Sequence, residues 1–500
     1  MLQLRRVPID TFSENVVYLN KNCSSWKIYE FDVSTRVEIH GGIFPLYASL
    51  EIVHDDAIVK PNEVGLSINT FKRINLPEGA EVSISPAPSA PSVDSIKRKV
   101  NGAVLSGSEY KAIVNDIVSG RYTQAEIAAF MVANGSFMTA QEVYSLTDAM
   151  AGEEDILTWE KEEMIVDHHC IGGVPGNRIT LIVVPIIAAC GLAIPSVATR
   201  AITSSSGVID AMEVLANIDF DEKNLYRIIE EHRGCIVWNE SLRIAPSGDT
   251  MLLVEKNIGM SIEQHIVASI ISSKVAAGIT HLVIDIPVGE GAKIKTMPEA
   301  MKIKKLFEYV CDLFSMQVDV VITDGSEPIG NGIGPVLEAR DIMKVLRCKK
   351  DAPNDLREKA LFIAGRILEF DSNLRGGEGY YTAREMLDSG RALETMNRII
   401  HAQGRTSPPM LGHLTRDVCA ENSGVVESIS NKRISRIAAL SGAPRDKGAG
   451  IDLLKKTGDF VERGEPLYRI HASRSTDFAF ANGYAEADSG YEIIIKSNKN

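Results

Sequence analysis

The sequence predicts an α/β protein built from several domains, and three observations support this. The chain has 500 residues, which is too long for one ordinary core and suggests two to four domains. A proline-rich stretch, Ser85–Ser92, separates a segment patterned as strands from one patterned as helices. From Glu163 onward, short β-branched runs alternate with helical stretches, as in a parallel sheet covered on both faces.

The first 84 residues are expected to form a β-rich N-terminal domain. Val33–His40 and Ala80–Pro86 alternate apolar and polar residues, and turn signals such as Gly41-Gly42 lie between them. The three prolines of Ser85–Ser92 can continue neither a helix nor a central strand, so a linker is expected there.

Residues 93–162 are expected to form an α-helical domain. Ser106–Gly152 has apolar residues at helical spacing, and two capping boxes mark helix starts: Thr123 with Glu126, and Thr139 with Glu142. Residues 250–280 are helical again, and we expect them to return to this domain.

Residues 163–249 and 281–415 are expected to form a central α/β domain with a mixed or parallel sheet. Its predicted strands are Met164–His169, Gly234–Trp238, His281–Val288 and Val318–Gly325. The longest apolar run, Leu181–Ile194, contains Pro185 and Gly191 and is predicted to form a strand, a turn and then a buried helix.

Residues 416–500 are expected to form a C-terminal α+β domain. Gly424–Ala472 is patterned as strands around the sequence GAPRDKGAG, and Thr457–Ile470 contains closely spaced Gly-Asp and Gly-Glu turns. This resembles β-hammerhead or lipoyl-like units. No lysine stands in an obvious turn where it could be modified, so a structural role is favoured.

Composition and charge exclude several classes of protein. The hydrophobic content of 45% and charged content of 24% are those of a globular protein. A net charge of −13 argues against general nucleic-acid binding, although a local patch of donors could still bind a small anion. No apolar run reaches the roughly 18 residues of a membrane span, and no signal peptide is recognised, so we expect a cytoplasmic protein. The 7 cysteines are scattered and form no CxxC pair, which predicts neither disulfides nor a zinc site.

The strongest chemical signal is Val166–Thr180, where a predicted strand is followed by a glycine-rich loop and a helix start. Gly172 and Gly173 let the backbone approach an anion, and the N–H groups of a helix start can donate to it. A plain tight turn would explain the glycines equally well. The polar side chains of the same segment favour a binding site: His168, His169, Cys170, Asn177 and Arg178.

A second candidate loop, Thr199–Asp210, contains five hydroxyl groups within eight residues, together with Arg200. Hydroxyl residues before a helix can simply be N-caps. Because one cap needs one hydroxyl, the run favours a wall that binds an oxyanion.

Other cofactor and metal motifs are absent from the sequence. The loop Asp324–Pro335 is rich in glycine but does not form GxGxxG, and no P-loop motif occurs, so neither a nicotinamide enzyme nor a P-loop ATPase is expected. His168 and His169 are adjacent on a strand and should point to opposite faces. We therefore expect neither a metal nor a cofactor.

From about Ser85 to His471 the chain resembles the thymidine phosphorylase and AMP phosphorylase family. The resemblance is carried by DHHCIGGVPGNR, TRAITSSSG, GCIVW, ASIISSK, HLVIDIPVG, DGSEPIG and GAPRDKGAGI. The N-terminal β domain matches the longer members, namely AMP phosphorylases and bacterial proteins called "putative thymidine phosphorylase". The family implies phosphorolysis of the N-glycosidic bond of a nucleoside or nucleoside monophosphate by inorganic phosphate, giving free base and sugar 1-phosphate. It also implies a homodimer joined through the helical domain, and no cofactor.

The resemblance implies roles for individual residues. His169 matches the histidine beside the phosphate loop and is a candidate for stabilising the leaving base, and Ser261 stands where AMP phosphorylases have an aspartate proton donor. The positions that match substrate-binding residues are His168, Cys170, Gly172, Gly173, Thr180, Thr199, Arg200, Ala201, Ile202, Thr203, Ser204, Val208, Ser269, Ser273 and Lys293.

Six of these positions depart from the family pattern. Thr199 replaces a serine. His168 replaces a lysine and Cys170 a serine. Val208 replaces the threonine that closes the phosphate site, and a buried anion oxygen left unpaired would cost about 1–3 kcal/mol. Ser273 replaces a lysine that contacts the base. Ser261 is a poor general acid, because its hydroxyl does not titrate near neutral pH.

Three functions fit this pattern: an active pentosyltransferase with altered base specificity, a degenerate homologue that binds nucleotide or phosphate without turnover, and a phosphorylase acting on an unusual glycosyl substrate. Lys293 and Arg200 would suit a phosphorylated sugar, since both can meet an anion at close range. Either could also be a solvated surface charge.

Overall fold

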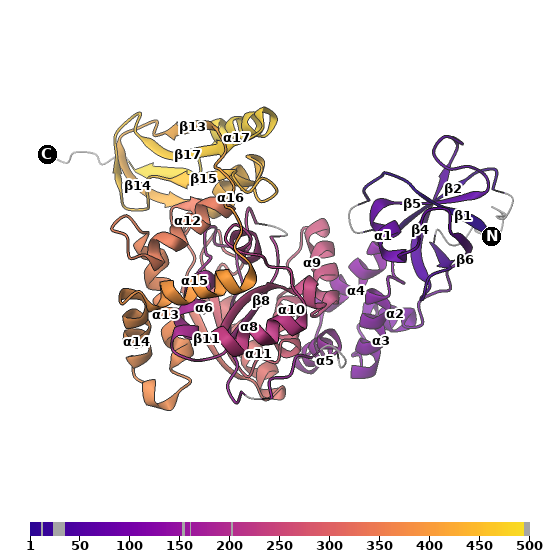
Figure 1. Ribbon diagram of the computed structural model, residues 1–500, viewed down its shortest axis with the longest axis horizontal. Helices are drawn as coiled ribbons and strands as arrows, with labels where there is room; N and C mark the ends of the chain where they lie inside the picture. The colour runs from indigo at the N-terminus through magenta and orange to yellow at the C-terminus, as the bar shows by residue number, and fades with distance from the viewer. Residues whose placement is uncertain (12–13, 24–35, 153–155, 161, 202–203, 495–500) are drawn as a thin grey trace. The chain divides into compact units, whose positions relative to one another are not determined.

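The computed structural model describes residues 1–11, 14–23, 36–152, 156–160, 162–201 and 204–494 (Figure 1). The chain divides into two compact units. The first unit holds Met1–Met150 and Pro246–Ile262, and the second holds Ala151–Ala245 and Glu263–Asn500. Among the described residues, no helix is both long and apolar enough to cross a lipid bilayer.

The first unit begins with a closed barrel whose strands are ordered β1-β5-β2-β4-β3-β6. These strands are β1 (Leu2–Arg6), β2 (Val16–Asn20), β3 (Arg36–His40), β4 (Leu46–Val53), β5 (Glu63–Leu66) and β6 (Glu81–Pro86). Apolar side chains fill the interior, and each of the six described strands pairs with a neighbour on both sides. β3 and β6 lie within the two segments whose alternation predicted strands.

The helices of the first unit are α1 (Ile68–Ile74), α2 (Val93–Val100), α3 (Gly107–Val118), α4 (Gln124–Ser136), α5 (Ala140–Ala151) and α9 (Pro246–Ile258). Both predicted capping boxes form, because Glu126 accepts from the Thr123 N–H at 2.8 Å and Glu142 from the Thr139 N–H at 2.9 Å. Glu142 also pairs with the buried Lys99 at 2.6 Å. This ion pair ties α2 to the start of α5.

The segment Pro246–Ile262 returns to the first unit, where α9 packs on α3 and α4. The predicted return covered residues 250–280, and its second helix, α10 (Glu263–Ala276), belongs to the second unit. There α10 packs against α11, and its Lys274 reaches Asp167. The boundaries of the four predicted domains stay a prediction.

The second unit contains a parallel sheet in two parts, β11-β10-β7 and β8-β9, joined by a parallel bridge between Ile165 and Ala193. Its strands are β7 (Val166–Cys170), β8 (Ile194–Ala198), β9 (Gly234–Trp238), β10 (His281–Val288) and β11 (Gln317–Asp324). Its helices are α6 (Thr180–Ala189), α7 (Val208–Met212), α8 (Glu222–His232), α11 (Met297–Leu313), α12 (Pro335–Leu346), α13 (Asn354–Leu368), α14 (Glu378–Asp388) and α15 (Arg391–Gln403). The predicted mixed α/β class is confirmed.

The apolar run Leu181–Ile194 is arranged differently from the prediction, which was wrong about its order. It forms helix first, as most of α6, and then a turn at Gly191 that leads into β8. All residues from Thr180 to Ala188 are buried, because α13, α14 and α15 pack around α6. A helix buried on every side has no polar face, so its sequence shows no helical periodicity.

The C-terminal part of the second unit is built from two small antiparallel sheets and two helices. Its elements are β13 (Leu414–Cys419), β14 (Gly424–Ile429), α16 (Asn431–Leu440), β15 (Gly450–Leu453), β16 (Phe460–Val461), β17 (Pro466–Ala472), α17 (Ser475–Ala487) and β18 (Tyr491–Ile494). β12 (Gly332–Ile333), from the loop after β11, pairs with β15 and joins one of these sheets. The C-terminal part is therefore hydrogen-bonded to a loop of the α/β part.

Candidate functional site

The loops that leave the carboxyl ends of the parallel strands form the candidate site. β7 lies between β10 on one side and β8 on the other, so the order of the strands reverses there. In open α/β sheets, ligands bind beyond the carboxyl ends of the strands at such a reversal. The loops after β7, β8 and β10 carry most of the predicted substrate-binding residues.

The glycine loop after β7 requires its glycines. Gly172 and Gly173 have φ angles of +94° and +93°, which side chains rarely tolerate. A Cβ at Gly173 would collide with the backbone nitrogen of Lys293, in the loop after β10. A Cβ at Gly176 would collide with the carbonyl oxygen of Ile329, in the loop after β11. Three loops therefore meet with their backbones in direct contact.

Two buried ion pairs lie beneath these loops. Lys274 pairs with Asp167 at 2.5 Å and donates to the Val197 carbonyl at 3.2 Å. Lys359 pairs with Asp285 at 2.9 Å and donates to Thr323 at 3.0 Å. Buried charges of this kind persist only when paired and hydrogen-bonded.

Sequence reasoning missed these pairs, since their partners are far apart in the chain. The available signal was a charged residue inside an apolar strand, such as Asp285 in HLVIDIPV.

His168 and His169 are neutral at pH 7. His168 is 3% exposed, and its Nε2 lies 3.4 Å from the Thr180 hydroxyl. Burial lowers the pKa of His168 to about 4. Burial and the nearby Lys274 lower the pKa of His169 well below its usual value. A neutral imidazole can donate one hydrogen bond and accept another.

Cys170 is a neutral thiol. Burial and the nearby Asp285 raise the pKa of Cys170 to about 12. Its sulfur accepts a hydrogen bond from the Asn177 amide at 3.2 Å. A thiol in this state can donate weakly to a ligand but is no nucleophile.

Arg178, which was expected among the polar groups of the binding loop, is used to hold loops together. Its Nε pairs with Glu338 at 3.1 Å, and its other nitrogens donate to the carbonyls of Asn177 and Ser206. The guanidinium thus joins the glycine loop to α12 and to the hydroxyl-rich loop.

In the hydroxyl-rich loop after β8, Arg200 forms two hydrogen bonds to Glu213, at 2.7 and 2.8 Å, and lies 4.7 Å from the Trp238 ring. Hydrogen bonds from Arg200 and Lys447 lower the pKa of Glu213 to about 2.

The hydroxyl groups of this loop differ in exposure. Ser204 donates to the Ser206 carbonyl at 2.7 Å, while Ser205 and Ser206 are buried. Only part of the expected hydroxyl wall therefore faces solvent.

The remaining predicted residues are spread over both units. Lys293 is exposed and lies beside Gly172. Ser269 and Ser273 are half-buried on α10, where Ser273 donates to the Ile270 carbonyl at 2.8 Å. Ser261 is exposed and belongs to the first unit.

The other predicted positions are placed as follows. Thr180 and Val208 begin α6 and α7, Thr199 and Ala201 flank Arg200, and Ile202 and Thr203 lie outside the described residues. The second unit thus brings His168, His169, Cys170, Gly172, Gly173, Thr180 and Lys293 together at the carboxyl end of β7 and β10.

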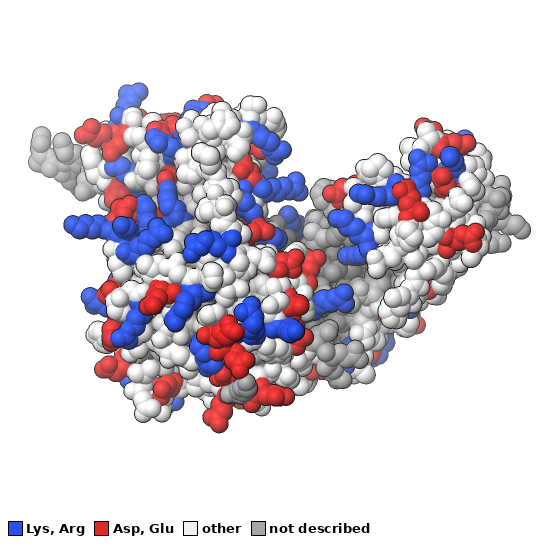
Figure 2. Space-filling model, in the orientation of Figure 1, with Lys and Arg blue, Asp and Glu red and all other residues white. Residues whose placement is uncertain are grey.

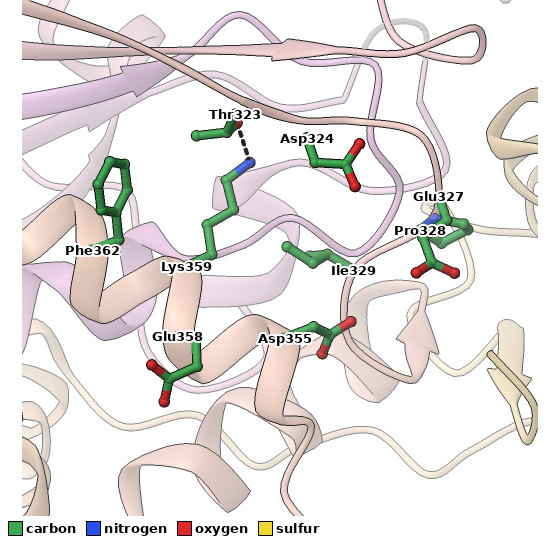
Figure 3. A pocket seen from close by; sticks show the side chains of 9 residues that line it. All are labelled: Thr323, Asp324, Glu327, Pro328, Ile329, Asp355, Glu358, Lys359 and Phe362. Carbon is green, nitrogen blue, oxygen red and sulfur yellow. Dashed lines mark hydrogen bonds between the residues drawn. The ribbon is translucent and has the colours of Figure 1, made fainter. Parts of the chain in front are cut away.

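A cavity of about 410 Å³ lies next to this cluster, at the carboxyl end of β11 (Figure 3). It is lined by Thr323, Asp324, Glu327, Pro328, Ile329, Asp355, Glu358, Lys359 and Phe362. Lys359 points to Thr323, and four of the lining residues carry carboxylates. Carboxylates repel an anion, so this cavity is unsuited to phosphate.

The charges of the described residues on one face of the molecule do not favour a nucleic-acid interface there (Figure 2). On the face shown in Figure 2, basic side chains are interspersed with acidic ones. The net charge of −13 agrees with this pattern.

Three family models match successive parts of the chain. The helical bundle domain of a glycosyl transferase family matches residues 93–152, and the a/b domain of that family matches residues 162–393. The pyrimidine nucleoside phosphorylase C-terminal domain matches residues 425–492.

Relatives cover nearly the whole chain. A protein of Albidiferax ferrireducens named "Putative thymidine phosphorylase" is 46% identical over 98% of this chain and 95% of its own length. Proteins of the same name from Methylococcus capsulatus and Rhodopseudomonas palustris are 47% and 48% identical, each over 98% of this chain and 96% of their own length.

Solved structures support the fold. Anthranilate phosphoribosyltransferase from Thermus thermophilus matches with a TM-score of 0.50 and 18% identity, over 62% of this chain and 99% of its own. The enzyme from Saccharomyces cerevisiae, solved with PRPP and Mg, matches with a TM-score of 0.50 and 15% identity, over 63% of this chain and 98% of its own. The three family models and the relatives that match nearly the full length show the family. The chain belongs to the thymidine phosphorylase and AMP phosphorylase family, in its long form.

Proposed function

We propose that the protein catalyses phosphorolysis of the N-glycosidic bond of a nucleoside or nucleoside monophosphate. The observation that carries this proposal is the cluster at the carboxyl end of β7, where the glycine loop, His169 and Lys293 meet above two buried lysine–aspartate ion pairs. The backbone N–H groups of a glycine loop and an exposed lysine such as Lys293 suit a phosphate anion.

In the proposed reaction, a phosphate oxygen forms a bond to the anomeric carbon while the bond from that carbon to the base nitrogen breaks. The electron pair leaves with the base, whose nitrogen takes up a proton as the attacking hydrogen phosphate loses one, so the products are free base and sugar 1-phosphate. The protein's task is to hold the anion against the sugar and to stabilise the charge that develops on the base. His169, as a neutral imidazole, would donate a hydrogen bond to the leaving base.

Three positions that depart from the family pattern bear on the substrate. Val208 supplies no hydrogen bond to the phosphate, and Ser273 supplies no charge to the base. Ser261 cannot protonate adenine in the way that an aspartic acid can. We therefore propose a substrate whose base leaves without strong acid assistance, and we assign no cofactor to the reaction.

The test is phosphate-dependent release of free base by the purified full chain. A panel of nucleosides and nucleoside monophosphates is incubated with and without phosphate, and the base is measured by chromatography. His169→Ala is expected to lower turnover by roughly 100-fold or more, the range of a lost proton or hydrogen-bond donor. His413→Ala removes an exposed histidine of the same unit and serves as the control.

A second function, binding of phosphate or nucleotide without turnover, is favoured by the same substitutions at Val208, Ser261 and Ser273. It predicts that phosphate or a nucleotide raises the melting temperature while no base appears. Turnover that disappears in His169→Ala excludes it.

We also propose that the protein is a homodimer joined through its helical segment, as the family resemblance implies. Light scattering coupled to size-exclusion chromatography measures this directly, because the chain mass is 54.5 kDa and a dimer has twice that value.

A further inference from the structure

Asp210 joins the two ends of the hydroxyl-rich loop. Its Oδ2 accepts the backbone N–H of Ala201 and that of Gly207, each at 2.9 Å. Its Oδ1 lies 3.0 Å from the Lys447 Nζ and 3.4 Å from an Arg200 nitrogen. Asp210 is 2% exposed, so a single buried carboxylate holds the start and the end of the loop together.

Gly207 shows how closely these ends approach each other. A Cβ at this position would lie 2.7 Å from the Ala201 nitrogen and 3.0 Å from the Arg200 carbonyl carbon. The backbone on either side of the loop is therefore in direct contact. Loss of the Asp210 hydrogen bonds would leave the backbone N–H groups of Ala201 and Gly207 without their acceptor, at the point where the two ends of the loop meet.

Lys447 supplies the countercharge from the C-terminal part of the chain. It lies in the GAPRDKGAG segment between α16 and β15, and its Nζ is 3.0 Å from Asp210 and 2.8 Å from Glu213. Arg200 contacts the same two carboxylates. A buried carboxylate is stable only when such partners neutralise it.

The C-terminal part also holds the loop after β11. Asn431, at the start of α16, donates to the Gly325 carbonyl at 2.8 Å. Lys456 donates to the Pro328 carbonyl at 2.7 Å and pairs with Asp355 at 3.0 Å. The contact between Lys447 and Asp210 is therefore one of several by which this part fixes the loops at the edge of the parallel sheet.

We propose that Lys447 is a positioning residue for the proposed reaction: through Asp210 it fixes Ala201 and Gly207, and so sets the affinity of the site for the nucleoside or nucleotide. This inference rests on the proposed function, because it gives the hydroxyl-rich loop a role in binding substrate. It also gives the C-terminal part a role in substrate binding, in addition to a structural role.

The first test measures the loop itself, by hydrogen exchange in peptides that contain Ala201 and Gly207. Lys447→Met is compared with Lys455→Met. Both lysine side chains are 21% exposed and both form ion pairs, but Lys455 pairs with Glu465 at 2.5 Å, away from the loop. Exchange should rise about tenfold in Lys447→Met, as expected for loss of a hydrogen bond to a charged group, and stay unchanged in Lys455→Met. Equal exchange in the two variants would overturn the proposal.

The second test measures phosphorolysis by the same variants. Lys447→Met should raise KM for the nucleoside or nucleotide about tenfold and change kcat little, because the loop contributes equally to binding of substrate and transition state. Lys447→Arg keeps the cation and should restore KM. A fall in kcat with KM unchanged, or failure of Lys447→Arg to restore KM, would contradict a positioning role.

The two proposals can fail separately. If the wild-type chain releases no base from any substrate, the proposed function fails, while the exchange experiment still decides whether Lys447 fixes the loop.

Discussion

At the scale of single residues, the site depends on where a side chain is absent as much as on where one is present. Gly173 has no room for a methyl group, because the loop after β10 crosses directly over it. Gly191, in the turn after α6, has a nearly identical φ of +90° but nothing within 4 Å of its Cβ position. Substituting alanine at each glycine therefore distinguishes two effects: at Gly173 the new Cβ collides with another loop and strains the backbone, and at Gly191 it only strains the backbone.

Gly173→Ala is expected to weaken phosphate binding and turnover by roughly 100-fold, because the loop must move by about an ångström. Gly191→Ala introduces the strain of a positive φ but no collision. It should lower the free energy of unfolding by about 1–2 kcal/mol and leave the affinity for phosphate unchanged. Calorimetric titration with phosphate measures the affinity, and thermal unfolding measures the strain. Unchanged phosphate affinity in Gly173→Ala would remove the glycine loop from the proposed site.

His168 should make the stability of the protein sensitive to acid. Its pKa is about 4 in the folded protein and near 6.5 in the unfolded chain, so between these values only the unfolded chain binds the proton. Stability therefore falls as the pH is lowered from 6.5 to 4, by about 1.4 kcal/mol per pH unit for this group.

His168→Asn is expected to remove that part of the slope. The free energy of unfolding, measured against pH, should fall less steeply in this variant than in the wild type. His40→Asn removes an exposed imidazole and is the matched control. A slope in His168→Asn equal to that of the wild type would show that His168 has nearly the same pKa in the folded protein as in the unfolded chain, and would contradict the lowered pKa.

At the scale of elements, the sequence predicted the strands better than the buried helix. β9 and β10 were predicted with their observed bounds, because short β-branched runs lie between clear helical segments. For the start of α6 the pattern predicts a strand instead, because Leu181–Ala188 is apolar on every side and contains Pro185. Pro185 lies within the helix, where a proline is usually disfavoured. Periodicity predicts a helix only where one face meets solvent.

The candidate site was predictable to the extent that its residues are adjacent in sequence. Val166–Thr180 could be selected from its glycines and polar side chains, and the structure places its His169 beside Lys274 and Lys293. The pairs Asp167–Lys274 and Asp285–Lys359 could not be predicted, because the fold alone brings their members together.

At the scale of the whole molecule, the two units have separate cores, so damage to one should leave the other folded. Lys99 and Glu142 form an ion pair in the first unit with side chains only 1% exposed. Removing one member of such a pair leaves a buried charge without a partner, which costs about 3–5 kcal/mol.

Lys99→Met is therefore expected to increase hydrogen exchange in α2–α5 and to leave exchange in α6 and β10 unchanged. Lys97→Met, two residues away, removes a lysine whose side chain is 68% exposed and paired with Asp94, and it should cost no more than about 1 kcal/mol. If exchange rises equally in both units of Lys99→Met, the two units unfold together, and the expectation that they unfold independently is wrong.

The return of Pro246–Ile262 to the first unit has a consequence for synthesis of the chain. Residues 151–245, which include β7, β8 and β9, must leave the ribosome before α9 does. At roughly 5–20 residues per second, this interval lasts about 5–20 seconds. During that time the faces of α3 and α4 that pack on α9 are open to chaperones or to neighbouring nascent chains. A ribosome stalled before residue 246 therefore holds a complete barrel beside an unfinished layer of helices.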